Sequence, residues 1–571
     1  MDCKARVLSD HYYDVITDYP LRIENVEGYD LCSTDVEHLY NIVYINRSGA
    51  GNILEQFQEY QSMPKLYGLM QGTGVAGGFD PGSLIAGGIT QIQRPPLNLT
   101  GRGTVVCIID TGIDYTNAAF RDADGNTRIL AIWDQTIQEG TPPEGFLYGT
   151  EYTTEEINRA LRSPDPYSVV PSRDENGHGS AMAGIAAGSS IDGGYTYLGA
   201  APDAWLVVVK LKECKPYLRE FYLVPGEVPA YQENDIMLAV EYADSFARVF
   251  RRPVVICLGV GTNMGDHSGS SFLSEYLSAV AVRRSRGVVV CGGNEGNAAH
   301  HYQGQLPVRS VGGENSVDVE IRVGEGSRGF YLELWGNVPD VFNLSIRSPG
   351  GEVIPPTRLG LNQSITYGFI YERTRVTIDG TLVEPNSGEQ LIRFRIEDPT
   401  PGIWTLRVMA VGELHNGTFH LWLPITAFLD VPIYFLSPDP YITLTEPAMA
   451  RDIISVSTYN SRNNSFYTES GRGFTRTGAI RPDFAAPGVD VSTIFGKNTG
   501  SSLAAAITAG AVAQFLQWAV VEGYNSNAES REIRNYFIRG ASRDANLTYP
   551  NREFGYGRLN MVGTFDALIG V

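Results

Sequence analysis

The chain of 571 residues lacks the features that direct a protein into or across a membrane. Its N-terminus contains no apolar stretch like that of a secretory signal, and nowhere do 18 apolar residues follow one another. An excess of positive charge is also missing, since 64 Asp and Glu outnumber 44 Lys and Arg. We therefore expect no membrane span and no nucleic acid partner, and we expect the protein to be made in the cytoplasm without a signal peptide.

Cysteine and histidine are scarce, with six and eight residues in the whole chain. The cysteines are widely scattered, and Cys107, Cys257 and Cys291 lie in apolar runs typical of buried strands, where a thiol acts as a small hydrophobic group. No Cys, His, Asp or Glu spacing typical of a metal site occurs. The sequence therefore predicts a protein without disulfides, metal or other cofactor, assembled in a reducing compartment.

Three short segments, far apart in the chain, each contain one residue of a Ser-His-Asp set. Asp110 ends the apolar run 105–109, His178 lies between two glycines, and Ser502 opens an alanine-rich stretch. A serine hydroxyl becomes a good nucleophile only beside a base, and a carboxylate holds that base in the correct tautomer. We therefore predict Ser502 as the nucleophile, His178 as the general base and Asp110 as the residue that orients it.

The sequence around these residues predicts where they lie in the fold. The run before Asp110 is typical of a strand buried on both faces, and parallel sheets place functional groups at the carboxyl ends of such strands. The alanines after Ser502 predict a buried helix whose positive end lies at the nucleophile. A second buried-strand run ends at Cys291 and leads to Asn294, whose amide would stabilise an oxyanion together with the Ser502 backbone N–H.

Each of these residues also has an ordinary structural interpretation when it is considered alone. Asp110 would then cap a helix, His178 would be a buried structural histidine, Ser502 would be a capping serine and Asn294 a turn residue. The combination of all the motifs in one order favours catalysis over these separate roles.

The chain order Asp, His, Ser is that of subtilisin, and the chain resembles the subtilases, the family of subtilisin-like serine proteases. Further matching segments are 199–204, 481–488 and 555–560, and the similarity covers roughly residues 100–310 and 440–571. The resemblance implies peptide hydrolysis without a cofactor, on a protein substrate.

The resemblance also implies that Gly259, Val260 and Gly261 form the strand that pairs with the substrate backbone. The family usually has Gly-Thr-Ser at the nucleophile, where this chain has a serine at 501 in place of the threonine. One hydroxyl replaces another there, so we expect activity to survive, and the alanines that follow fix the nucleophile as Ser502. Gly259 stands where the family usually has serine, and we expect this change to loosen the first specificity pocket.

The composition along the chain predicts an α/β fold in five segments. Residues 1–70 form a small α+β region, with a strand within 38–45 and helical periodicity at 52–60, and residues 71–98 form a glycine-rich linker that is flexible over 71–90. Residues 99–312 and 436–571 form a subtilisin-like core with a mostly parallel sheet flanked by helices. Residues 313–435 alternate between strands and turns, which predicts an inserted all-β jelly roll.

A small region before a subtilase core resembles a prodomain, which would assist folding, bind the active site as a partner and be removed by self-cleavage within 71–98. The inserted jelly roll and Pro64–Met70 are similar to the clostridial Csp-type spore-germination subtilases. That resemblance implies a spore-associated serine endopeptidase that activates the zymogen of a spore-cortex hydrolase. The alternative is an inactive pseudoprotease that acts as a signalling or scaffold partner, and a covalent serine-directed probe distinguishes the two.

Overall fold

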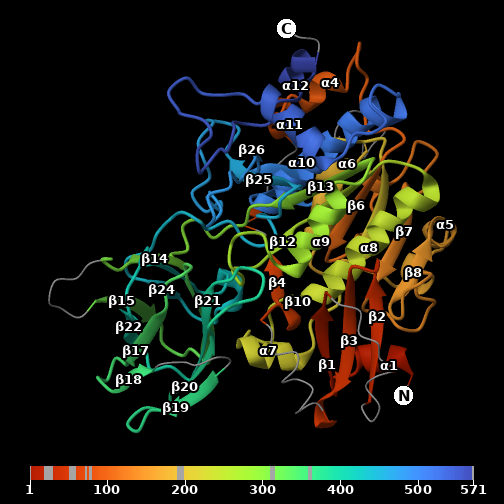
Figure 1. Cartoon of the computed structure of the whole chain (residues 1–571). Helices are drawn as coiled ribbons and strands as arrows, with labels where there is room; N and C mark the ends of the chain where they lie inside the picture. Colours follow the sequence, from red (N-terminus) through yellow and green to blue (C-terminus); the bar gives the residue numbers. More distant parts are fainter. Residues whose placement is uncertain are drawn as a thin grey trace.

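The computed structural model describes residues 2–18, 30–49, 60–70, 72, 74–75, 80–189, 199–308, 315–357 and 363–568. Its centre is a sheet in the order β26-β25-β13-β11-β6-β9-β7-β8 (Figure 1). The strands are β6 (Val105–Asp110), β7 (Ile129–Asp134), β8 (Thr150–Thr153), β9 (Trp205–Lys210), β11 (Val254–Leu258), β13 (Arg286–Cys291), β25 (Ile454–Tyr459) and β26 (Phe484–Pro487). All neighbouring pairs are parallel except β7 with β8, so the mostly parallel core sheet is confirmed.

Helices cover both faces of this sheet. The helices that contact its strands are α5 (Thr154–Leu161), α6 (His178–Ala187), α8 (Glu233–Phe250), α9 (Phe272–Ala281), α10 (Ser501–Leu516) and α11 (Ser530–Gly540). Of two further helices, α12 (Met561–Leu568) packs on α11, and α7 (Pro216–Tyr222) follows β9 in the chain. Along β6, Val106 and Ile108 pack in the core that contains α6 and α10, whereas Val105, Cys107 and Ile109 pack in the core that contains α8 and α9. Burial on both faces explains why this strand has no alternation of polar and apolar residues.

The helix α10 is the central core helix of the protein. Together with the π-helical turn Gln517–Val521 it is long and apolar enough to cross a membrane, yet 83% of that stretch is buried inside the protein. Its small residues permit close packing, because a Cβ added at Gly510 would lie 2.3 Å from the Cβ of Ala200 and 2.6 Å from the backbone oxygen of Ala186.

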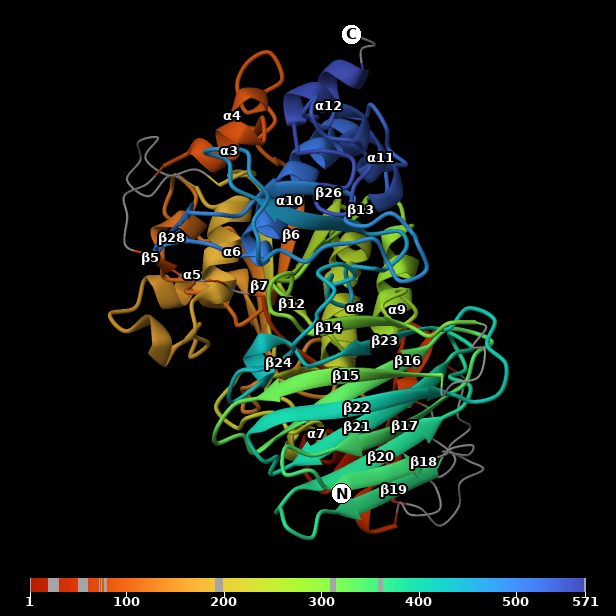
Figure 2. The same cartoon turned by 90° about the vertical axis from the view of Figure 1, so that its left-hand side faces the viewer.

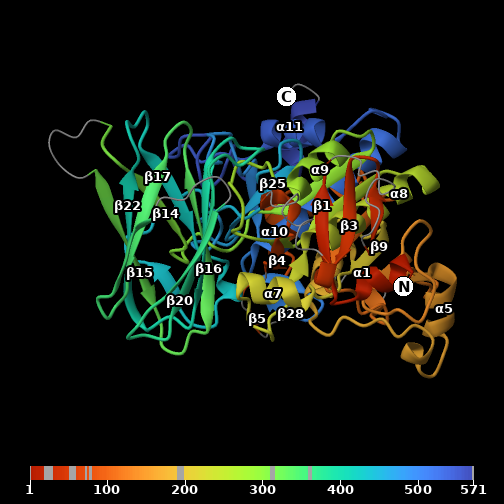
Figure 3. The same cartoon turned by 60° about the horizontal axis from the view of Figure 1, so that its bottom comes forward.

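A separate all-β unit is inserted between β13 and β25. A six-stranded antiparallel sheet, β14-β23-β16-β21-β20-β19, faces a five-stranded one, β18-β17-β22-β15-β24, across an apolar core of its own (Figures 2 and 3). The strands are β14 (His301–Gln305), β15 (Ser316–Val323), β16 (Gly329–Gly336), β17 (Phe342–Arg347), β18 (Val353–Thr357), β19 (Gln363–Gly368), β20 (Arg375–Thr381), β21 (Gln390–Glu397), β22 (Gly402–Ala410), β23 (Thr418–Trp422) and β24 (Ile433–Phe435). The predicted inserted β unit is confirmed; it begins at β14, earlier than residue 313, and its jelly-roll topology stays a prediction.

The N-terminal region packs against the face of the core that α8 and α9 cover (Figure 1). It consists of α1 (Cys3–Leu8) and an antiparallel sheet in the order β1-β3-β2. The strands are β1 (Tyr12–Thr17), β2 (Leu31–Val36) and β3 (Tyr40–Asn46). The strand predicted within 38–45 is thus found as β3, whereas the helix predicted at 52–60 lies almost wholly outside the described residues.

Two expectations from the sequence need correction. Cys3 and Cys32 form a disulfide that joins α1 to β2, so the prediction of a protein without disulfides is wrong. The sequence separation of 29 residues hid this pair, which only the fold brings together. The other cysteines are free and buried, as expected of small hydrophobic groups.

The segment predicted as a flexible linker contains regular structure instead. It forms the short helices α3 (Gly82–Ala86) and α4 (Ile89–Ile92). Leu84, Ile89 and Ile92 are buried in the main core, and α4 packs on α12. Burial of these three apolar side chains offsets the conformational freedom that the neighbouring glycines would otherwise retain.

The N-terminal region, the core and the inserted sandwich meet at Glu333 of β16, whose side chain is buried. One carboxylate oxygen accepts hydrogen bonds from the hydroxyls of Tyr60 (2.7 Å) and Tyr331 (2.9 Å). The other accepts bonds from the backbone N–H of Gly265 and the indole of Trp335, each at 3.0 Å. Tyr60 comes from the N-terminal region and Gly265 from the core, so one carboxylate joins all three parts.

Replacing Glu333 with alanine leaves these four buried donors without their acceptor. We expect Glu333→Ala to lower the free energy of unfolding by at least about 3 kcal/mol, since each unsatisfied buried group costs about 1–3 kcal/mol. The matched control is Glu325→Ala in an exposed turn of the same sandwich, which we expect to change the free energy by less than about 0.5 kcal/mol. Chemical unfolding followed by tryptophan fluorescence measures both, and equal midpoints for the two variants would contradict this role of Glu333.

Candidate active site

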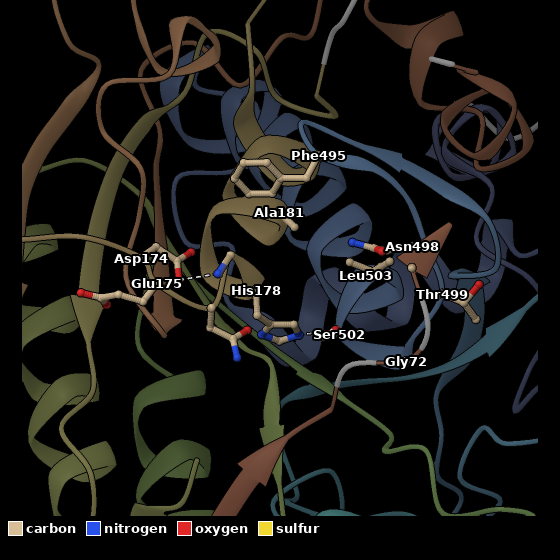
Figure 4. A pocket seen from close by; sticks show the side chains of 13 residues that line it. Gly72, Asp174, Glu175, His178, Ala181, Phe495, Asn498, Thr499, Ser502 and Leu503 are labelled. Carbon is tan, nitrogen blue, oxygen red and sulfur yellow. Dashed lines mark hydrogen bonds between the residues drawn. The ribbon is translucent and has the colours of Figure 1, made fainter. Parts of the chain in front are cut away.

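The three predicted residues come together at the carboxyl edge of the central sheet. Asp110 ends β6, His178 is the first residue of α6, and Ser502 lies in the first turn of α10. The Nδ1 atom of His178 lies 2.7 Å from Oδ1 of Asp110. Its Nε2 atom lies 2.8 Å from Oγ of Ser502 (Figure 4). The three side chains therefore form the continuous carboxylate–imidazole–hydroxyl chain that activates a serine.

The environment of His178 adjusts its pKa for work as a base. Burial lowers the pKa, but the charge of Asp110 and its hydrogen bond raise it, with a further contribution from Asp174, and the net result lies above the usual 6.5. A raised pKa strengthens the imidazole as an acceptor of the serine proton. It also means that the imidazole is fully neutral only above that raised value.

Asp174 positions the histidine and was not singled out from the sequence. Its Oδ1 accepts hydrogen bonds from the Thr111 hydroxyl and the Gly177 N–H, both at 2.8 Å. Its Oδ2 accepts bonds from the backbone N–H and the hydroxyl of Ser180, at 2.8 and 2.6 Å. These bonds tie the residues on both sides of His178 to the residue that follows Asp110. The only signal in the sequence is an acidic residue before an Asn-Gly turn.

The amide of Asn294 is aimed at a peptide carbonyl of the chain itself. Its Nδ2 donates a hydrogen bond of 2.9 Å to the backbone oxygen of Met70, and its Oδ1 accepts one of 3.0 Å from the Ser501 N–H. Because the Ser501 N–H can donate only to the amide oxygen, the second bond leaves the amide nitrogen pointing at Met70. Asn294 thus donates to a peptide carbonyl and is itself held by the residue before Ser502; its role as a donor to an oxyanion stays a prediction. The second donor expected there, the Ser502 N–H, stays a prediction.

Met70 follows a strand that lies in the site as a substrate would. This strand, β4 (Leu66–Leu69), pairs with β12 (Val260–Gly261) on one side and with β10 (Tyr231–Gln232) on the other. The Met70 N–H donates to the Gly259 oxygen at 2.9 Å. Gly259, Val260 and Gly261, predicted to pair with a substrate, therefore pair with the chain's own N-terminal region.

The chain continues beyond Met70 across the other side of the site. Gly74–Val75 (β5) pairs with Gly496–Asn498 (β28), which in turn pairs with Val491–Thr493 (β27). A cavity of about 500 Å³ opens beside this segment (Figure 4). His178, Ser502, Ala181, Leu503 and Phe495 contribute to its lining. The site thus offers open space beside His178 and Ser502.

The change from serine to glycine at 259 does not leave an open pocket. A Cβ built at Gly259 would lie 2.4 Å from Sδ of Met182 and 2.9 Å from Oδ2 of Asp110. Met182 of α6 is fully buried and fills the space that a side chain at 259 would need. The side chain that Gly259 lacks would thus meet Met182 and Asp110 instead of open space, and the looser first pocket stays a prediction.

A hydrogen-bonded carboxylate–imidazole–hydroxyl chain beside an amide that donates to a peptide carbonyl defines the site of a serine protease. A model of the subtilase family matches residues 101–322 and 406–557, and the chain belongs to this family. The unmatched stretch between the two parts lies inside the inserted sandwich. The protein is accordingly a subtilisin-type serine protease with an inserted all-β unit.

Two relatives illustrate the match. The known structure of the CspB protease of Clostridium perfringens is 30% identical and has a TM-score of 0.76, and the alignment covers 86% of this chain and 97% of that chain. The C5a peptidase of Streptococcus pyogenes serotype M3 is 21% identical over 440 residues, which are 72% of this chain and 34% of that protein. The chain thus spans about a third of the length of this curated relative.

The raised pKa of His178 predicts how reactivity depends on pH. Protonated His178 cannot accept the Ser502 proton, so covalent labelling of Ser502 by a fluorophosphonate probe should slow as the pH falls, with a midpoint above 6.5. In Asp110→Asn the main causes that raise the pKa of His178 are lost while burial remains, and Asp174 alone still raises it, so the midpoint should move to lower pH. The maximal rate should fall by about 10⁴-fold, the loss known for this substitution in another triad.

Intact-mass spectrometry of labelled protein over a range of pH measures both effects. Glu175→Gln serves as the control, since this exposed carboxylate beside Asp174 bonds to Lys210 and not to the histidine. A midpoint below 6.5 in the wild type, or a midpoint that Asp110→Asn leaves in place, would overturn the assignment of Asp110 as the partner of His178.

Proposed function

We propose that the protein is a serine endopeptidase that first cleaves its own chain after Met70. The observation that carries this proposal is the hydrogen bond from Asn294 to the Met70 oxygen. It supports the Met70 carbonyl as the one that is attacked, and the pairing of β4 with β12 aligns the backbone that leads to it. The Met70 carbonyl is part of the Met70–Gln71 peptide bond, so this is the bond that would be cut. Gln71 itself lies outside the described residues.

The chemistry follows from the atoms in the site. Nε2 of His178 takes the proton of Ser502 Oγ as this oxygen attacks the Met70 carbonyl carbon, and the resulting oxyanion accepts a hydrogen bond from Asn294. Collapse of the intermediate breaks the C–N bond, and His178 gives its proton to the amine of Gln71. Water, deprotonated by His178, then hydrolyses the ester, which releases the Met70 carboxylate and restores Ser502.

The cut would make residues 1–70 a prodomain, held to the protease by noncovalent contacts. Lys65 and Glu233 illustrate them, since both side chains are fully buried, the Lys65 N–H donates to the Glu233 carboxylate at 3.1 Å, and the two charges pair at 3.4 Å. Removing either charge alone leaves the other buried and unpaired, which is strongly unfavourable. Such contacts support a prodomain that keeps the site occupied after cleavage, as an inhibitor that a substrate must displace.

The resemblance to Csp-type proteases supports a role beyond self-cleavage. The similarity to the Clostridium perfringens CspB protease extends over nearly the whole of that chain. On this basis we propose that the mature enzyme activates a protein zymogen, the precursor of a spore-cortex hydrolase, in association with the spore. The chemistry above uses only side chains of the protease and needs no cofactor.

Self-cleavage predicts a defined pair of products. Intact-mass spectrometry of the purified protein should show two polypeptides, ending at Met70 and beginning at Gln71, whereas Ser502→Ala should remain whole. Ser501→Ala is the matched control, because it keeps the backbone N–H that Asn294 accepts and removes only the neighbouring hydroxyl; it should still be cut.

A wild-type chain that stays whole and takes up no fluorophosphonate probe would favour the inactive scaffold protein instead. Cleavage that persists in Ser502→Ala would refute Ser502 as the nucleophile. Loss of cleavage in Ser501→Ala would refute it as well. A cut at another bond would refute the assignment of Met70.

A further inference from the structure

Gly68 occupies a position in the cleft where any side chain would collide with the protease. In β4 it lies opposite Gly261, and it is the third residue before the proposed cut when Met70 is counted as the first. Leu66 and Met70, two residues away on either side, pack in the main core, whereas Tyr67 and Leu69 pack in the core on the other face. Since side chains alternate along a strand, a side chain at 68 would point the same way as Leu66 and Met70.

The space on that side is filled by the segment that joins β23 to β24 within the inserted sandwich. A Cβ built at Gly68 would lie 2.5 Å from Cδ1 of Ile425 and 3.2 and 3.4 Å from two ring atoms of Phe428. Ile425 and Phe428 are both 1% exposed and belong to the same core as Met70. These two residues, which we call the cleft roof, close the cleft above the third position.

The cleft roof is anchored and cannot simply lift away. Phe428 ends the 3₁₀ turn Thr426–Phe428 and donates its N–H to the Ile425 oxygen at 2.9 Å. The Thr426 N–H donates to Oε1 of Glu295 at 2.9 Å, and Oε2 of the same buried carboxylate lies 2.6 Å from Nδ1 of His300. Glu295 is the residue after Asn294, so the roof is tied directly to the segment that polarises the scissile carbonyl.

We propose that Ile425 and Phe428 determine specificity and restrict the third position before the cleaved bond to glycine, in the chain itself and in protein substrates. This inference rests on the proposed cleavage after Met70. A larger residue there would force the roof and β4 apart in a fully packed region, and the misplacement would move the scissile carbonyl away from Asn294 and Ser502.

The test measures the rate of self-cleavage in the full chain after cell-free synthesis. Gly68→Ala should be cut at least about tenfold more slowly than the wild type, because overpacking a buried site and displacing the reacting group both raise the barrier. The double variant Gly68→Ala, Ile425→Ala should be cut nearly as fast as the single variant Ile425→Ala. Removing three carbons from the roof makes room for the methyl group added at 68.

Gly368→Ala in β19 is the matched control. It adds the same methyl group to another strand glycine, where nothing lies within 4 Å of the new Cβ, and it should be cut at the wild-type rate. Cleavage of Gly68→Ala at the wild-type rate, or no recovery in the double variant, would overturn the role of the roof. No cleavage in the wild type would instead refute the proposed function, so the two failures are distinguishable.

A second measurement avoids any effect of the substitution on folding. Synthetic pentapeptides with the sequence of 66–70, carrying Gly or Ala at the third position, are added to wild-type protein before the fluorophosphonate probe. The glycine peptide should slow the labelling of Ser502 at a concentration at least about tenfold lower than the alanine peptide, because only the former fits beneath the roof. Equal potency would contradict the restriction to glycine.

Discussion

The pairing of β4 with β12 is the contact on which the geometry of the site depends. It places the Met70 carbonyl against Asn294 and brings the N-terminal region into the same cleft as Ser502. Every group around the serine is fixed by a rigid element: Asp110 by the end of a buried strand, His178 by the start of α6, and Asn294 by the loop after β13. In the proposed self-cleavage, β4 positions the peptide bond of Met70 on which these groups act.

The inserted sandwich forms part of the wall of this cleft. Glu333 in its six-stranded sheet accepts a hydrogen bond from Tyr60, and the segment between β23 and β24 supplies Ile425 and Phe428 next to Gly68. Both contacts involve residues 60–70, the stretch that leads to Met70. The insertion therefore has a physical link to the segment that leads to Met70, although the family model leaves its middle part, residues 323–405, unmatched.

The parts that could be predicted from the sequence are those in which local pattern and chemistry agree. Uniformly apolar runs identified the central strands, and the small residues around His178 and Ser502 identified two buried helices whose ends meet. Asp110, His178, Ser502 and Asn294 could be found because each occupies the boundary of such an element.

What could not be predicted depends on contacts between distant segments. Cys3 and Cys32 meet only because α1 packs beside β2, and Met182 fills the space at Gly259 only because α6 packs on the neighbouring strand β6. Glycines before the core suggested flexibility, but Leu84 and Ile89 are held in the main core. The sequence around Met70 has no feature that marks it as the proposed cleavage site, since that proposal rests on the hydrogen bond from Asn294 and on the pairing of β4 with β12.

The most direct test of this account is a crystal structure of uncut Ser502→Ala. We predict that the Met70 carbonyl oxygen lies within hydrogen-bonding distance of Nδ2 of Asn294, with residues 66–69 paired to 260–261. A structure in which this segment lies outside the cleft, or in which another carbonyl occupies the position beside Asn294, would contradict it.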